Sequence, residues 1–247
     1  MVETCLIFSP HQDDACLACG GFILKKTKKK ENIVIINTCN GRNVFLLFFG
    51  VKDNPSPKEI EQIRNEEDIK AMNLLGVPKE NIIFLGFEDV LMYKQRKNAE
   101  EKILELIKKI KPSEVYIPSD IEIHPDHIIT SEVVKKCLRK INFKNPVYEY
   151  YVWSRSKIKE KKDLITVDIS EELDMKKKAI QEYKSQVEIF LPQQKEPVLE
   201  KEFINQFYQN KEFFKKIDIF KNENILYKFY KGIKVRFISL LWTKFKI

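Results

Sequence analysis

The side chains best suited to chemistry in this chain are its histidines, which are few and grouped. The chain contains only three, and all of them fall in two short acidic clusters, His-Gln-Asp-Asp at residues 11–14 and His-Pro-Asp-His at residues 124–127. Imidazole is the commonest metal-binding side chain in proteins and titrates near neutral pH. Histidines without a shared role would be scattered along the chain, so the two clusters together predict a mononuclear metal hydrolase site.

The two clusters contain a complete ligand set for a catalytic metal ion. His11, Asp14 and His127 would supply two neutral imidazoles and one carboxylate, a usual set for catalytic zinc that leaves one position open. Zinc is the expected ion, although another divalent metal would suit the same ligands. Asp13 is expected to point to another side of the turn, as a general base beside the metal. His124 is the candidate donor to a developing oxyanion.

Other roles for these residues have to be weighed against the metal site. Asp126 is expected to orient His124 or His127 through a hydrogen bond, and Pro125 suits the first position of a helix. Each cluster alone is weak evidence, because His-x-x-His pairs occur by chance on surface helices and paired aspartates can cap a helix. The combination of both clusters with every histidine in the chain favours the metal site.

The hydrophobic pattern predicts the scaffold that would bring the clusters together. Short runs rich in Ile and Val, typical of buried strands, alternate with longer amphipathic segments. The expected strands cover residues 6–8, 33–36, 82–85, 115–117, 147–152 and 164–167, and the expected helices cover residues 15–28, 57–75, 99–110 and 171–189. This alternation predicts an α/β fold with a mostly parallel sheet and helices on both faces.

Both clusters follow strands of that predicted sheet. The first cluster comes directly after the first strand, and the second follows, by a short loop, the strand that ends near Ile117. Ligands of parallel α/β sheets bind beyond the carboxyl ends of the strands. We therefore expect the two clusters to meet at one rim of the sheet.

The composition argues against several other functional classes. The 247 residues are 43% hydrophobic and 32% charged, with a formal net charge of +8. No basic stripe with interleaved aromatic residues and no nucleic-acid-binding module precedes the C-terminal tail, so no nucleic-acid partner is expected. A secretory signal and an apolar run of about 20 residues are both missing. The expected location is the cytoplasm, or the inner face of a membrane as a peripheral protein.

Cysteine and glycine motifs add little chemistry. The five cysteines are odd in number and lie mostly in apolar context, which indicates reduced thiols in a cytosolic protein. Cys16-x-x-Cys19 falls in an expected helix, where packed small residues are favoured over redox chemistry. Gly20-Gly21 lacks the Gly-x-Gly-x-x-Gly spacing, so a nicotinamide cofactor is not expected.

Four stretches of the sequence resemble one known family, the LmbE-like or PIG-L zinc-dependent N-deacetylases. Residues 9–14 with Gly20-Gly21 resemble the His-Pro-Asp-Asp-Glu…Gly-Gly opening of that family, and residues 124–127 match its second motif residue for residue. Residues 64–77 resemble its Arg-x-x-Glu…Ala…Leu-Gly helix, and residues 178–186 resemble its late Lys-Ala…Ser-Gln helix. We therefore expect a deacetylase domain over residues 1–190 and a helical or irregular C-terminal extension over residues 191–247.

The resemblance implies a Rossmann-like fold and an activity. The enzyme would remove the acetyl group from an N-acetylated amino sugar, with zinc held by His11, Asp14 and His127. Asp13 would be the general base and His124 the oxyanion-stabilising group, with a further role for His124 as acid for the leaving amine left open.

Two substrate contacts and two departures also follow from the resemblance. Arg64 falls where the family places a sugar-contacting arginine, and Asp89 falls where it often has a substrate-facing aspartate. The alternative for Arg64 is a solvated helix position paired with Asp68. Gln12 replaces the usual proline, which reduces loop rigidity. Ala15 replaces the usual glutamate, and the loss of such a supporting group can weaken metal binding roughly ten- to a hundredfold.

Several functions remain open at the level of sequence. The expected substrate is an N-acetylated sugar that is free, nucleotide-linked or lipid-linked. An amidase acting on another N-acyl group and a non-catalytic carbohydrate-binding homologue are the alternatives. Intact Asp13 and His124 argue against a mere binding protein, because binding requires no base beside the metal. The sequence carries no indication of the oligomeric state.

The C-terminal tail has a different character from the rest of the chain. Residues 198–247 are rich in Phe, Tyr and Lys, and apolar residues alternate with cations near the end. Such a pattern suits a peripheral segment lying on an anionic membrane. Packing of the tail against the sheet is the competing expectation.

Overall fold

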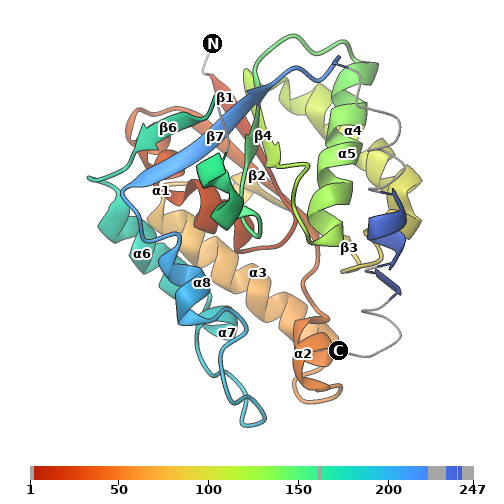
Figure 1. Cartoon of the computed structure of the whole chain (residues 1–247), viewed down its shortest axis with the longest axis vertical. Coiled ribbons are helices and arrows are strands. Elements are labelled where there is room, and N and C mark those ends of the chain that lie inside the picture. Colours follow the sequence, from red (N-terminus) through yellow and green to blue (C-terminus); the bar gives the residue numbers. More distant parts are fainter. Residues whose placement is uncertain (1–2, 161–162, 222–231, 238, 241–247) are drawn as a thin grey trace.

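The computed structural model describes residues 3–160, 163–221, 232–237 and 239–240, which are built around one twisted sheet (Figure 1). Its seven strands lie in the order β3-β2-β1-β4-β5-β7-β6. Neighbouring strands from β3 to β5 are parallel, whereas β7 runs antiparallel to both of its neighbours. The strands are β1 (Thr4–Ser9), β2 (Asn32–Cys39), β3 (Ile82–Phe87), β4 (Glu114–Pro118), β5 (Val147–Tyr150), β6 (Ile165–Asp168) and β7 (Lys211–Ile217).

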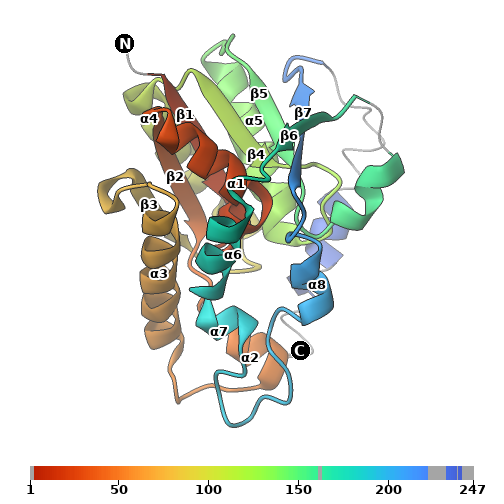
Figure 2. The same cartoon turned by 90° about the vertical axis from the view of Figure 1, so that its left-hand side faces the viewer.

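Long helices cover both faces of this sheet, as Figures 1 and 2 show together. Side chains alternate along a strand, so Ile7 of β1 packs in one core and Leu6 and Phe8 pack in the other. The first core lies under α1, α3 and α6, and the second lies under α4 and α5. These helices are α1 (Asp14–Lys28), α3 (Pro57–Leu74), α4 (Arg96–Ile110), α5 (Pro125–Lys140) and α6 (Leu173–Gln181). The predicted α/β fold is confirmed.

Short elements gather beyond the carboxyl ends of the parallel strands, at the bottom of both views (Figures 1 and 2). They are the helices α2 (Val44–Phe49), α7 (Lys184–Val187) and α8 (Lys201–Asn205). Short 3-10 helices elsewhere are η1 (Lys79–Asn81), η2 (Met92–Gln95) and η3 (Arg155–Glu160). This is the rim at which ligands of α/β sheets bind, and the three short helices surround it.

Two helices begin with local signals that the sequence carries. Ser56 caps α3 in a capping box with Glu59, and Pro57 occupies the first turn. His124 stands at the N-cap of α5, and its imidazole Nδ1 accepts a hydrogen bond from the backbone N–H of Asp126. Because Pro125 follows in the first turn, the His-Pro-Asp-His cluster is also the start of a helix.

The C-terminal segment expected to be helical or irregular supplies strand β7, which lies inside the sheet between β5 and β6. Glu212 of β7 accepts hydrogen bonds from the backbone of Gly21 and Phe22 in α1, at 2.9 and 2.8 Å. The same carboxylate meets Lys176 Nζ of α6 at 2.7 Å, and both side chains are fully buried. The chain beyond residue 190 is therefore partly integral to the sheet, which residue patterns alone did not reveal.

The predicted helix over residues 171–189 is divided into α6 and α7. The division falls at Tyr183, whose hydroxyl donates to Asp68 at 2.7 Å. Directly after it, Ser185 donates from its backbone and hydroxyl to Glu67 of α3 at 2.8 and 2.6 Å. These tertiary hydrogen bonds replace helical ones, so the amphipathic pattern continues while the helix does not.

Two further expectations can be compared with the fold. Cys16 and Cys19 are fully buried in the core beneath α1 and form no disulfide, as expected for packed small residues. Within the described ranges, no helix is long and apolar enough to cross a membrane. Most of the basic, apolar end of the chain, residues 222–231 and 241–247, lies outside the described residues.

Candidate active site

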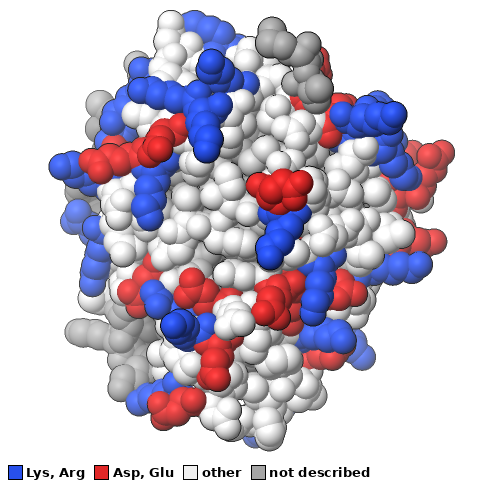
Figure 3. Space-filling view, turned by 180° about the vertical axis from the view of Figure 1, so that it is seen from behind, with Lys and Arg blue, Asp and Glu red and all other residues white. Residues whose placement is uncertain are grey.

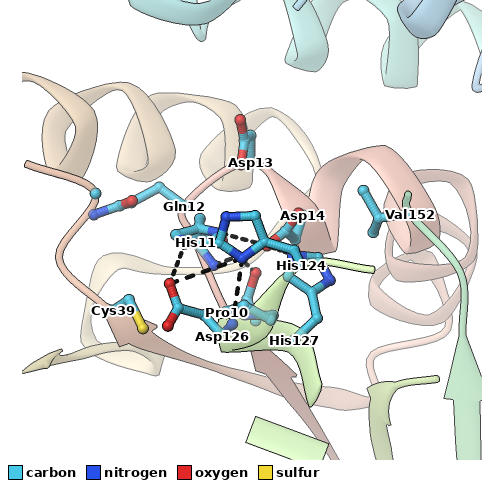
Figure 4. A network of polar contacts seen from close by, with 12 residues as sticks. Pro10, His11, Gln12, Asp13, Asp14, Cys39, His124, Asp126, His127 and Val152 are labelled. Carbon is cyan, nitrogen blue, oxygen red and sulfur yellow. Dashed lines mark hydrogen bonds and ion pairs between the residues drawn. The ribbon is translucent and has the colours of Figure 1, made fainter. Parts of the chain in front are cut away.

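All three histidines converge at the carboxyl rim of the sheet. His11 lies in the turn between β1 and α1, and His124 and His127 belong to the first turn of α5. The ring centroid of His11 lies 4.8 Å from that of His124 and 5.6 Å from that of His127 (Figure 4). Two segments more than a hundred residues apart thus form one cluster.

Asp14 connects two of these imidazoles. Its Oδ2 lies 3.2 Å from His11 Nδ1 and 3.1 Å from His127 Nε2. The structure therefore brings together the three predicted ligands. The ring nitrogens of His11, His124 and His127 also lie within 4.8 Å of one another, so the geometry accommodates either Asp14 or His124 as the third ligand.

The surroundings of His127 test whether a cation fits here. The side chain is fully buried, and neither ring nitrogen makes a regular hydrogen bond with any residue that the structure describes. Leaving buried polar atoms unbonded costs free energy. Because Nε2 faces the carboxylate of Asp14 across a short gap, a divalent cation fits this set of donors.

The electrostatics of the cluster also favour positive charge at this point. Burial by itself would lower the pKa of His11, but its contacts with Asp126 and Asp14 outweigh burial and raise the pKa to about 10. Burial by itself would raise the pKa of Asp14, yet His127 and His11 hold that pKa well below its ordinary value. A bound cation would take the place of the proton on His11, since metal ligands bind deprotonated.

The carboxylate of Asp126 lies closer to the imidazole of His11 than to that of His124, and the sequence had suggested His124 or His127 as its partner. Its Oδ2 lies 3.2 Å from His11 Nε2 and accepts the backbone N–H of Val90 at 2.9 Å. The same oxygen is 3.8 Å from His124 Nδ1, and no contact with His127 is found among the described residues. That Asp126 orients His124 or His127 stays a prediction, and the side chains of Asp126 and His127 leave the first turn of α5 in different directions (Figure 4).

Glu122 is the carboxylate beside His127, and it was not predicted. It is fully buried, and its Oε2 lies 3.8 Å from His127 Nδ1. Its oxygens accept the backbone N–H groups of Val152 and Trp153 and the hydroxyl of Ser154. Glu122 thus joins the histidine cluster to the loop after β5. Only its position two residues before the His-Pro-Asp-His cluster hinted at this role.

Asp13 lies apart from the ligand cluster, as expected for a base. Figure 4 shows its carboxylate directed to the opposite side of the turn from Asp126. Burial raises the pKa of Asp13, and the guanidinium of Arg64 offsets that effect only in part. Arg64 Nη2 donates to Asp13 Oδ1 at 3.4 Å, and Nη1 donates to the carbonyl of Gly41 at 3.2 Å. Arg64 is buried, so it is not the solvated partner of Asp68 considered above.

Asp89 shapes the loop after β2 as well as lining the cavity. Its two oxygens accept the backbone N–H groups of Gly41 and Asn43, at 2.7 and 3.0 Å. Gly41 has φ +66°, and a Cβ there would lie 2.6 Å from the side chains of Arg64 and Gln12. The close approach requires glycine, and it places Arg64 beside Asp13. Asp89 therefore positions this loop in addition to any contact with substrate.

The two departures from the family pattern have structural counterparts. Gln12 donates to the backbone oxygen of Asn40 at 3.0 Å and to Asn65 Oδ1 at 2.9 Å, so its side chain ties the turn to its neighbours. Ala15 is fully buried, and its backbone N–H donates to the hydroxyl of Ser9. The rigidity that proline would give the turn is replaced by side-chain hydrogen bonds.

A cavity of about 590 Å³ opens above the cluster. Its floor contains the polar residues described above, namely His11, Asp13, Asp14, Arg64, Asp89 and His124. The late helix that resembled the Lys-Ala…Ser-Gln motif contributes Gln186, which is held in place through Ser185 and Glu67. This volume is in the range of small-molecule sites.

Comparisons with solved structures show where this fold recurs. The N,N'-diacetylchitobiose deacetylase from Pyrococcus horikoshii is 22% identical, with TM-score 0.67 over 88% of this chain and 84% of that chain. A zinc-inhibited form of teicoplanin deacetylase is 17% identical, with TM-score 0.62 over 74% of this chain and 85% of that chain. The 4-carboxy-2-hydroxymuconate hydratase from Pseudomonas putida is 15% identical, with TM-score 0.68 over 91% of this chain and 100% of that chain.

A family model adds the evidence from sequence. The model described as GlcNAc-PI de-N-acetylase, PIG-L, matches residues 6–138. The match extends over more than half of the chain and includes both histidine clusters, the arginine of α3 and the cavity floor. This chain belongs to the PIG-L family.

Proposed function

We propose that the protein is a metal-dependent N-deacetylase that acts on an N-acetylated amino sugar. The observation that carries the proposal is the largely buried cluster of His11, Asp14 and His127, with Asp13 and His124 beside it in the lining of one cavity. The family match supports the same reaction, and zinc is the ion that this donor set suits best. His11, Asp14 and His127 would hold the ion.

The proposed reaction assigns a separate role to the bound cation, to Asp13 and to Arg64. A bound divalent cation would polarise the acetamide carbonyl and lower the pKa of water. Asp13 takes a proton from the water that attacks the carbonyl carbon, and Arg64 keeps this carboxylate in position. The carbon–nitrogen bond then breaks, and the proton taken by Asp13 goes to the departing nitrogen. The products are acetate and a free amine.

His124 is placed to stabilise the negative charge that develops on the carbonyl oxygen. Its Nδ1 accepts the backbone N–H of Asp126 at 3.3 Å, so in the neutral ring the proton lies on Nε2. That N–H is the donor available to the oxyanion. Burial and the neighbouring His11 lower the pKa of His124 to about 3, in keeping with a neutral ring.

Competing functions make different predictions for the same assay. The hydratase from Pseudomonas putida shares the fold at 15% identity, so the fold alone does not select deacetylation. An amidase for another N-acyl group would use the same cluster with a different substrate, and a non-catalytic homologue would bind sugar without turnover. Asp13 lies beside the cluster, and burial raises its pKa, which suits a residue that exchanges protons. This property favours a catalytic protein over one that only binds sugar.

The test is release of acetate and amine from N-acetylglucosamine derivatives by the purified protein. We expect one zinc ion per chain, activity that chelators abolish, and recovery when zinc is restored. His127→Ala should lose both metal and activity. If this variant binds zinc as well as the parent does, the ligand assignment is wrong. If the metal-loaded parent releases acetate from no N-acetyl sugar, the deacetylase proposal fails.

We also propose that the protein is cytoplasmic and that its C-terminal tail contacts an anionic membrane. Ile233, Phe237 and Leu240 are about half exposed, and Arg236 lies among them. Val235 is buried against the core and supports the alternative of a packed tail. Flotation with anionic liposomes at low salt decides between them. The protein should co-float, and Phe237→Ser should co-float less. If the parent protein does not co-float, the membrane proposal is wrong and the tail packs against the core instead.

A further inference from the structure

The cavity above the catalytic cluster has walls of a different chemistry from its floor. Helix α2 contributes one apolar wall, and the segment leading into α8 contributes another. The apolar lining residues of these walls include Leu47, Phe48, Trp153, Val198, Leu199 and Phe203. Away from the floor, the polar lining among described residues is Gln186 and Glu200. A substrate that fills this cavity must therefore present apolar surface above its reacting group.

The aromatic part of the wall begins at the catalytic cluster. The indole of Trp153 lies nearly parallel to the His124 ring, with centroids 6.2 Å apart and an angle of 22°. The ring of Phe203 follows, 4.7 Å from Trp153. Phe48 lines the same cavity from α2, and 45% of its surface is exposed. An aromatic surface thus begins at His124 and continues through Trp153 to Phe203, and Phe48 adds a further aromatic ring to the lining.

The charges in the cavity oppose a phosphate or diphosphate group. Among the described lining residues the acidic side chains are Asp13, Asp14, Asp89 and Glu200, and Arg64 is the single lysine or arginine. The guanidinium of Arg64 already donates to Asp13 and to the backbone of Gly41. Although the whole chain carries an excess of positive charge, that excess is not directed into this cavity.

We propose that the substrate carries an uncharged apolar aglycone, an alkyl or aryl group, which binds against Phe48, Trp153 and Phe203. This inference rests on the proposed deacetylase function, and it narrows the substrate to a neutral apolar glycoside. A nucleotide diphosphate would place negative charge among the carboxylates. A second sugar would need more hydrogen-bonding partners than these walls provide.

The test is a series of N-acetylglucosamine glycosides with methyl, butyl and hexyl groups, used below the concentration at which they form micelles. Burial of one methylene contributes about 0.8 kcal/mol, which corresponds to a rise in kcat/KM of about three- to fourfold per buried methylene. We expect kcat/KM to increase along the series. A nucleotide-diphosphate-linked N-acetylglucosamine and N,N'-diacetylchitobiose should fall below the hexyl glycoside.

Phe48→Ser is the matched variant, because Phe48 is 45% exposed and its replacement leaves the core intact. The ratio of kcat/KM for the hexyl glycoside to that for the methyl glycoside should fall about tenfold or more. Phe220→Ser is the control, since Phe220 is 43% exposed and lies outside the cavity lining. That substitution should leave the ratio unchanged.

The outcomes separate this inference from the function on which it rests. Acetate release from no glycoside would overturn the deacetylase proposal itself. Acetate release with equal kcat/KM for methyl and hexyl glycosides would overturn the apolar subsite and leave the deacetylase standing. A preference for the nucleotide-linked sugar or for chitobiose would do the same, and would assign the cavity to a polar acceptor.

Discussion

Asp13 and Asp14 are adjacent in the chain, are both buried, and yet have opposite electrostatics. Burial raises the pKa of each carboxyl, but Asp14 lies between two imidazoles and its pKa ends well below the ordinary value. Asp13 has the guanidinium of Arg64, 3.4 Å away, as its main positive partner, and its pKa ends above the ordinary value. Such a difference suits one carboxylate to hold a cation and the other to exchange protons.

The division of roles can be tested by removing the acid–base function alone. Asp13→Asn should retain zinc, because the amide that replaces the carboxylate keeps a side-chain oxygen near Arg64 while the ligands are untouched. Turnover should fall by about 10²–10⁴ because the base is missing. Metal content and acetate release, measured on the same preparation, check this. An asparagine variant with nearly full turnover would place the base elsewhere.

A second prediction concerns Asp68, whose buried carboxyl lies outside the histidine cluster. Burial raises its pKa to about 7, and hydrogen bonds from Tyr183 and Asn37 offset burial only in part. Asp13 raises this pKa further, while Arg64 lowers it. The folded state thus binds the proton more tightly than the unfolded chain does. The contribution of protonated Asp68 to the free energy of unfolding is complete below about pH 4 and is lost as the pH rises toward 7.

Asp68→Asn should remove the decrease in stability that Asp68 causes as the pH rises. Asn37 Oδ1 has no hydrogen-bond partner among the described residues, so a turned amide can accept from the new side chain while Tyr183 keeps its acceptor. Relative to the variant, the parent should lose stability between about pH 4 and pH 7, by about 1.4 kcal/mol per unit of raised pKa. Urea unfolding of both proteins across this range measures the difference. Parallel pH profiles would contradict the prediction.

At the scale of elements, helix α3 connects the catalytic turn to the late helices. Arg64, Glu67 and Asp68 are spaced three and four residues apart and therefore share one helix face. Arg64 bonds Asp13, Glu67 bonds Ser185, and Asp68 bonds Tyr183. One polar stripe on α3 thus positions Asp13 on one side and the cavity-lining segment with Gln186 on the other.

The junction of α1, α6 and β7 depends on a buried ion pair that can be broken from one side. Lys176→Met leaves the Glu212 carboxylate buried without its partner at 2.7 Å. Removing one partner of a buried pair costs about 3–5 kcal/mol. We expect that loss in the free energy of unfolding, measured with urea. Adding Glu212→Gln should restore part of it, because a neutral amide can still accept a backbone N–H. An unchanged single variant would show that the pair contributes nothing.

At the scale of the whole molecule, side chains of both charges share the surface, and a strand near the C-terminal end of the chain completes the sheet. Lys and Arg lie among Asp and Glu on the face shown in Figure 3, with apolar and neutral side chains between them. Strand β6 is hydrogen-bonded to β7, and β7 is the partner that joins it to β5. The sheet is therefore complete only when the residues after 210 have been added.

The expected boundary at residue 190 can be tested by truncation. A chain ending at residue 190 lacks β7, leaves β6 without its strand partner and removes Glu212 from Lys176. We expect this chain to be insoluble or to lack a cooperative thermal transition in circular dichroism. A chain ending at residue 221 keeps β7 and separates loss of the strand from loss of the tail. Cooperative unfolding of the shorter chain would establish an independent domain over residues 1–190.

Local signals account for what the sequence by itself determined. The alternation of Ile- and Val-rich runs with amphipathic segments predicted β1 to β6 and helices α1, α3, α4 and α6, since hydrophobic periodicity reflects which face is buried. For helix α5 the sequence indicated only the first turn, through Pro125. The placement of both histidine clusters after strands predicted that they would meet, because parallel strands end at one rim.

Only the tertiary structure decided the features that depend on distant partners. Strand β7 has a polar, lysine-containing sequence and becomes a strand because β5 and β6 flank it. Glu122 became the neighbour of His127, and Asp126 that of His11, because side-chain direction follows the turn rather than the spacing. The cavity walls come from α2, the loop after β5 and α8, segments whose proximity no local pattern encodes. Contacts between residues far apart in sequence are made by packing, and packing is a property of the folded chain as a whole.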